Sequence, residues 1–70
     1  MQTRTQVCEI NFEDCGWMIQ LAKMSRSAKR IVLINFQPTA VNGSFIASVS
    51  AENKLDVSLG DNSLVLEKSA

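Results

Sequence analysis

The chain is 70 residues long, has no histidine and only two cysteines, and carries seven basic and seven acidic side chains that cancel to a net charge of zero. A chain of this length supports one hydrophobic core, and a hydrophobic fraction of 46% is typical of folded chains. We therefore expect one small domain over residues 1–70, without the overall positive charge that would draw it to nucleic acid or anionic lipid.

The first predicted element is a strand over residues 5–12. Cys8 and Ile10 alternate with Glu9 and Asn11 along this segment. Such a period of two is typical of a strand with one buried face.

A helix is predicted over residues 15–27. Trp17, Leu21 and Met24 recur at the spacing of one helix face. Asp14 stands where its carboxylate can cap the first amide groups and complement the helix dipole.

The next segments are a predicted central strand and a long loop. Residues 31–36 form a continuous β-branched and aromatic run, which predicts a strand buried on both faces. Residues 37–44 contain the only proline, Pro38, and the pair Asn42-Gly43, which predict a turn outside the sheet.

The C-terminal half is predicted to be a meander of strands. Apolar and polar residues alternate over residues 45–51 and again over 55–59. Residues 52–53 supply the turn between them, and residues 60–63 turn into a last strand at 64–66.

These elements predict an α+β fold in the order β-α-β-β-β-β, with one amphipathic helix packed on a mainly antiparallel sheet of about five strands. A sheet of this kind leaves open edges, and a chain this short lacks the disulfides or metal that stabilise many small domains. We therefore expect the protein to form a homodimer.

The residues that enzymes and metal sites need are mostly missing. Without histidine there is no partner for a cysteine nucleophile, and too few soft ligands remain for a structural zinc site. Gly16, Gly43 and Gly60 lie too far apart to form a phosphate-binding loop. The acidic pairs are explained by capping or by turns, so we expect a protein that is not an enzyme and holds no cofactor or metal.

Cys8 and Cys15 are expected to be reduced, and burial of Cys15 beside Trp17 is favoured over the alternative of an exposed, reactive thiol at the start of the helix. The first residues contain no apolar segment of a secretory signal, and no apolar run reaches the roughly 18 residues of a membrane span. We therefore expect a soluble cytoplasmic protein with no membrane partner.

The strongest functional candidate is a basic cluster without any acidic residue, formed by Lys23, Arg26, Lys29 and Arg30. Cations at the end of a helix complement its dipole, and that structural role alone explains them about as well as a binding role. As a binding site they suit an acidic protein surface or phosphates. The predicted partner-binding residues are these four cations together with Trp17 and Met18.

Two functions remain open at this point. The leading hypothesis is a small non-enzymatic regulatory or inhibitory protein that binds a larger protein, as a homodimer. The alternative is a nucleic-acid-binding module, RNA or DNA, that uses the basic end of the helix. The basic cluster has no interleaved aromatic residues for base stacking, which weakens the alternative.

Overall fold

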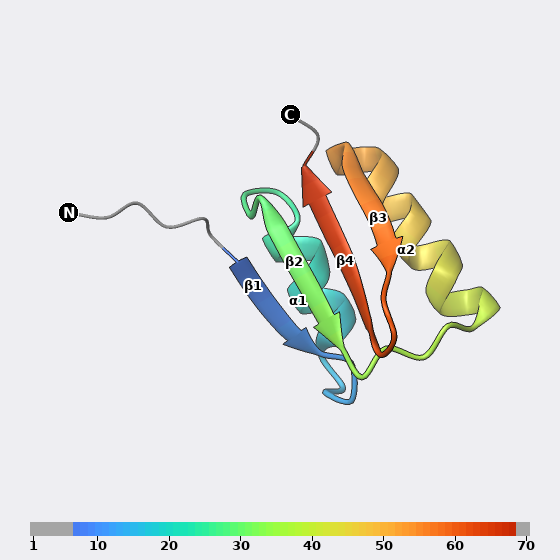
Figure 1. Cartoon of the computed structure of the whole chain (residues 1–70). Coiled ribbons are helices and arrows are strands. Elements are labelled where there is room, and N and C mark those ends of the chain that lie inside the picture. The colour runs from blue at the N-terminus through green and yellow to red at the C-terminus, as the bar shows by residue number, and fades with distance from the viewer. Residues whose placement is uncertain (1–6, 69–70) are drawn as a thin grey trace.

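The elements follow the order β-α-β-α-β-β in a computed structural model that describes residues 7–68 (Figure 1). Four strands form one sheet, and two helices connect them. The elements are β1 (Val7–Asn11), α1 (Trp17–Met24), β2 (Arg30–Ile34), α2 (Ala40–Asn53), β3 (Leu55–Leu59) and β4 (Ser63–Lys68).

The sheet is mixed and has the strand order β1-β2-β4-β3. β1 and β2 run parallel and are joined through α1, with Ile10 opposite Leu33. β4 runs antiparallel to both of its neighbours, with Leu64 opposite Leu33 on β2 and opposite Leu59 on β3. Within residues 7–68, β1 and β3 are thus the edge strands.

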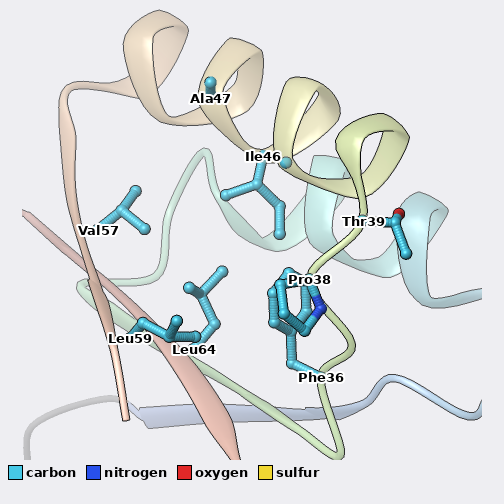
Figure 2. A pocket seen from close by; sticks show the side chains of 9 residues that line it. Phe36, Pro38, Thr39, Ile46, Ala47, Val57, Leu59 and Leu64 are labelled. Carbon is cyan, nitrogen blue, oxygen red and sulfur yellow. The ribbon is translucent and has the colours of Figure 1, made fainter.

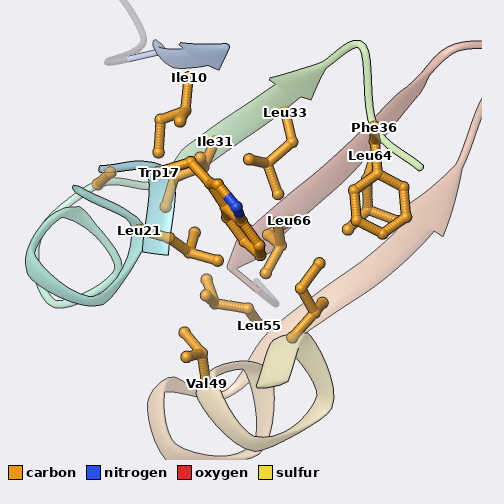
Figure 3. Packing of buried hydrophobic residues seen from close by; sticks show 12 residues of the cluster. Ile10, Trp17, Leu21, Ile31, Leu33, Phe36, Val49, Leu55, Leu64 and Leu66 are labelled. Atoms are coloured by element: carbon orange, nitrogen blue, oxygen red, sulfur yellow. The ribbon is translucent and has the colours of Figure 1, made fainter. Parts of the chain in front are cut away.

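Both helices lie on the same face of the sheet, α1 toward the β1 side and α2 toward the β3 side (Figures 1 and 3). The hydrophobic core fills the space between them and the sheet, because the inward residues of every strand are apolar. Its members are Ile10, Trp17, Leu21, Ala28, Ile31, Leu33, Phe36, Ile46, Val49, Leu55, Leu64 and Leu66.

Aromatic rings join four segments at one side of this core. The ring centroid of Phe12 lies 4.6 Å from that of Trp17 and 5.2 Å from that of Phe36. Trp17 also packs edge-on against Phe45, with centroids 5.6 Å apart. Offset and edge-on pairs of this kind add stability beyond the burial of their area. They tie the start of α1 to α2.

The α+β class predicted from the sequence is confirmed, but the element count and the sheet type are wrong. Residues 7–68 form two helices and a four-stranded mixed sheet, instead of one helix and about five mainly antiparallel strands. The predicted strand at residues 31–36 corresponds to β2, and the one at 55–59 is β3. The predicted strand at 5–12 matches β1 from Val7 onward, and its first two residues lie outside the described residues.

The main correction concerns residues 45–51, which were predicted as a strand and lie in α2. Ile46 and Val49 are the buried residues of this helix, and Phe45 and Asn53 are half-buried on the same side. The spacing of these four residues is helical. Weak helix formers such as serine and valine are held in the helix by this packing, because tertiary contacts override local propensity.

The start of α2 corrects the predicted loop at residues 37–44. Thr39 is the N-cap, and its side-chain oxygen accepts a hydrogen bond from the Asn42 amide at 3.2 Å. Pro38 precedes the cap, where its missing amide donor costs the helix nothing. Gly43, predicted to turn, instead donates its amide to Thr39 O at 2.8 Å as part of the first helical turn.

α1 is shorter at both ends than the predicted helix of residues 15–27. It begins after Gly16, which offers no side-chain cap. Asp14 acts from further upstream, where its carboxylate accepts from Gly16 N at 3.4 Å and from Gln20 Nε2 at 3.1 Å. The helix ends at Met24, and its C-cap Ser25 keeps helical backbone angles and donates its hydroxyl to Ala22 O at 3.0 Å.

β2 is the central strand, but only one of its faces is fully buried. Ile31 and Leu33 face the helices and are buried, whereas Val32 and Ile34 lie on the other face and are half-buried. The prediction of burial on both faces is wrong because both helices cover the same face of the sheet. No element within residues 7–68 covers the opposite face.

Candidate functional site

The topology gathers cations at one end of the domain. β2 begins and β4 ends there, and the Lys68 amide donates to Lys29 O at 2.9 Å. The end of α2 lies at the same place, since Lys68 Nζ donates to Asn53 O at 3.3 Å. Six of the seven basic residues of the chain thus form what we call the basic end, namely Lys23, Arg26, Lys29, Arg30, Lys54 and Lys68.

The opposite end of the sheet is acidic. Glu13 and Asp14 follow β1 there, and Asp61 lies in the turn between β3 and β4. No basic residue among residues 7–68 lies at that end. The basic end also holds carboxylates, those of Glu52, Asp56 and Glu67, so it carries six positive and three negative charges. Although the chain is neutral, its charges are therefore separated along the strand direction.

The exposed side of α1 links an apolar residue to this basic end. Ile19 is 70% exposed, Ala22 and Lys23 follow it on the same helix face, and Arg26 lies in the turn directly after the helix. We call these four residues the α1 stripe. The stripe combines one large exposed apolar side chain with a lysine and an arginine, and of these two cations arginine is the one enriched at protein interfaces.

Ser25 holds the end of the α1 stripe in place. Its side chain is completely buried, and its hydroxyl accepts from Asn53 Nδ2 at 3.1 Å while donating to Ala22 O. Asn53 also donates to Val49 O at 3.0 Å. These hydrogen bonds fix the end of α1 against the end of α2, so the residue directly before Arg26 is held in place.

The structure divides the six predicted partner-binding residues among four places. Lys23 and Arg26 lie together on the α1 stripe, and Lys29 lies in the exposed connection to β2. Arg30 is the first residue of β2 and points to the sheet face opposite α1, because its neighbour Ile31 points inward. Trp17 and Met18 form a separate group.

Trp17 is buried, with 8% of its surface exposed, and packs between Phe12 and Phe45 in the core. Met18 is half-buried against the core cluster. Neither side chain stands on the surface as Ile19 does. The accessible part of the predicted site is therefore the set of cations.

The prediction of the site from the sequence did not include three surface residues. Ile19 could have been recognised as an apolar residue on the polar face of the predicted helix, four positions before Lys23. Lys54 and Lys68 carry no such signal, because only the strand order brings Lys68 beside Lys29 and the start of β3 to the same end of the sheet.

A second surface feature is an apolar groove between α2 and β3 (Figure 2). Its volume of about 220 Å³ is below the range of about 300 Å³ and upward that is usual for small-molecule sites. Val57 and Leu59 on its β3 side are 43% and 61% exposed. The lining consists of Phe36, Pro38, Thr39, Gly43, Ile46, Ala47, Val57, Leu59 and Leu64.

The described residues offer little else for chemistry. No group of three or more metal-ligating side chains occurs within residues 7–68. Cys8 and Cys15 are both free thiols, and Cys15 is exposed, which corrects the predicted burial beside Trp17. Cys15 lies in the turn before α1, ahead of the first buried residue of that helix. None of the helices in the described part of the chain is long and apolar enough to cross a bilayer.

No family of proteins, curated protein or solved structure matches this chain. Its function is therefore inferred from the surface residues themselves.

Proposed function

We propose that the protein is a small non-enzymatic regulator or inhibitor that acts as a homodimer and binds an acidic surface on a larger protein through the α1 stripe. The observation that carries this proposal is the 70% exposure of Ile19 on the same helix face as Lys23, with Arg26 in the turn that follows. Burial of an aliphatic side chain of this size contributes about 1.5–3 kcal/mol. The cations then favour a partner of opposite charge and speed the encounter.

The basic end supports the electrostatic part of the proposal. Lys54 and Lys68 join the cations of residues 23–30 there, and the six positive charges outnumber the three carboxylates of the same end. The partner we propose is therefore acidic, with an apolar pocket that receives Ile19. Trp17 supports the surface from within the core and does not contact the partner.

Nucleic acid is the second candidate, and the six cations of the basic end are the observation that favours it. Against it stand the aromatic residues. Trp17 and Phe36 are buried, and Phe12 and Phe45 pack against the core, so no aromatic ring among residues 7–68 offers an exposed face for base stacking. Base stacking on such rings supplies much of the affinity of single-strand binders.

Affinity capture from an extract of the source cells, with the full chain immobilised, tests the protein-binding proposal. We compare the wild type with I19S and with K23E. Each variant has a control at an exposed residue of α2 away from the basic end. These controls are V41S, since Val41 is 73% exposed, and S44E, which places a carboxylate near the start of α2.

The proposal expects one acidic protein that the wild type and both controls retain, and whose dissociation constant rises at least about tenfold in I19S and in K23E. Equal retention by a variant and its control would overturn the role of the α1 stripe. Binding of a 20-nucleotide single strand or duplex that falls with salt along a log–log slope near −3 would establish the alternative, because about four phosphate contacts give that slope.

A further inference from the structure

β3 is an edge strand without the features that usually protect an edge. Four of its five residues are exposed, and its ladder to β4 runs without a bulge. It contains no lysine or proline, and Asp56 carries its one charge. Natural edges avoid pairing with other chains through bulges, prolines, lysines or a covering element.

The apolar residues of β3 face the groove under α2. Val57 and Leu59 share their sheet face with Leu55 and with Leu64, which are buried. Figure 2 shows their side chains beneath α2, on the open side of the groove. Gly43 and Ala47 are the helix residues above this side, and their small size leaves the space open. β1 differs, because its inward residue Ile10 is already buried under α1.

The free backbone groups of β3 can be assigned from its pairing. The Gly60 amide donates to Ser63 O at 2.8 Å, so residue 60 turns its backbone groups toward β4. In an antiparallel ladder alternate residues direct their backbone groups to the same neighbour, so residues 58 and 56 also bond to β4. Leu55, Val57 and Leu59 direct their amide and carbonyl groups away from β4, toward the open edge. The Leu55 carbonyl agrees with this assignment, since it accepts the Ser50 hydroxyl rather than a group on β4.

We infer that two copies of the chain pair antiparallel through β3, with Ser58 of each copy opposite Ser58 of the other. This inference concerns the homodimer of the proposed function and does not depend on the α1 stripe. In this register Val57 of each copy lies opposite Leu59 of the other copy. The outward amide and carbonyl groups of these two residues form four hydrogen bonds between the copies.

The neighbouring registers are less favourable for reasons of charge and hydrogen bonding. Centring the pair on Asp56 places two carboxylates directly opposite each other, which destabilises a sheet. Centring it on Val57 requires the Leu55 carbonyl, which already accepts from Ser50. The Ser58 register places Asp56 opposite the uncharged Gly60 and buries exposed apolar surface in both grooves.

The interface is expected to be weak, because an edge of five residues is small beside the ~800 Å² per partner of stable complexes. Sedimentation between about 10 µM and about 1 mM should show the mass rising from the 7.7 kDa monomer toward twice that value. L59K should raise the dissociation constant at least tenfold. V41K, a matched change at an exposed apolar residue of α2, should leave it unchanged.

Single cysteines, placed in a chain that also carries Cys8→Ala and Cys15→Ser, identify the register under mild oxidation by air and a copper catalyst. S58C should form a disulfide-linked dimer. The two copies of residue 58 form a non-hydrogen-bonded pair, whose Cα atoms lie about 4.5 Å apart, and a disulfide can span that distance. D56C should not.

The remaining outcomes overturn the inference in distinguishable ways. A D56C dimer, or a link formed only between S58C and D56C chains, would establish another register. A dimer that L59K does not weaken would place the homodimer interface elsewhere and leave the proposed function standing. A monomer at every concentration would refute the dimer altogether, without bearing on the binding of a partner by α1.

Discussion

Replacing Ser25 with alanine should destabilise the protein through the contact between the ends of α1 and α2. The Ser25 hydroxyl is fully buried and accepts from Asn53 Nδ2 at 3.1 Å. Its loss leaves the Asn53 side-chain amide with only its bond to Val49 O. S25A removes one oxygen atom and creates no large cavity, so the hydrogen bond dominates the change.

The loss of a buried hydrogen bond whose partner stays in place costs about 1–2 kcal/mol. For a domain of this length, each kcal/mol corresponds to about 4–8 °C in the midpoint of thermal unfolding, so we expect S25A to lower it by roughly 10 °C. Ser27 is exposed, and S27A should change stability by less than about 0.5 kcal/mol.

Thermal and urea unfolding of S25A, N53A and the double variant measure this contact. The two substitutions should be non-additive by about 1 kcal/mol, because each removes the same hydrogen bond. Additive effects, or an S25A as stable as S27A, would refute the view that Ser25 fixes the end of the α1 stripe.

Three further substitutions test the rest of the fold by urea unfolding. T39A should cost about 1 kcal/mol and T39S much less, because serine keeps the oxygen that accepts from the Asn42 amide; equal effects would contradict the cap. G43A should stabilise the protein by about 0.5–1 kcal/mol, since a Cβ there meets no atom within 4 Å and alanine favours a helix; a loss of stability would contradict a helical Gly43. R30E should lower the free energy of unfolding by about 1 kcal/mol, because the new carboxylate lies opposite Glu67 in the pairing of β2 with β4. An R30E variant as stable as R30Q would contradict the register of these two strands.

The sequence predicted correctly those parts of the fold whose residue pattern fits only one type of secondary structure. The run of residues 31–36 is too short for a typical helix and too apolar for a loop, and it gives β2. Leu55, Val57 and Leu59 alternate strictly with polar residues and give β3. For β2 local propensity and burial favour the same structure, and for β3 the alternation of apolar and polar residues was sufficient.

α2 was missed because two periods fit the same residues. Phe45, Ala47, Val49 and Ala51 alternate like a strand, yet Ala47 and Ala51 are exposed. Alanine is small enough to be read as apolar in a strand and to stand on the surface of a helix. The informative residue was Ile46, which breaks the alternation and is buried.

The candidate site was predicted only where it is continuous in the sequence. Lys23 and Arg26 are one helical turn apart, so any helix over residues 15–27 brings them together. The placement of Arg30 on the opposite sheet face depends on the register of β2, and the arrival of Lys68 beside Lys29 depends on the strand order. Neither property is local.

Photo-crosslinking from the centre of the α1 stripe tests the central claim most directly. A benzophenone amino acid at position 22, between Ile19 and Lys23, is introduced in the source cells, and Asp61 at the acidic end serves as the control position. Binding through the α1 stripe predicts a single crosslinked protein from position 22 that is absent from position 61 and lost when I19S is added. No adduct from position 22, or the same adduct from both positions, would contradict it.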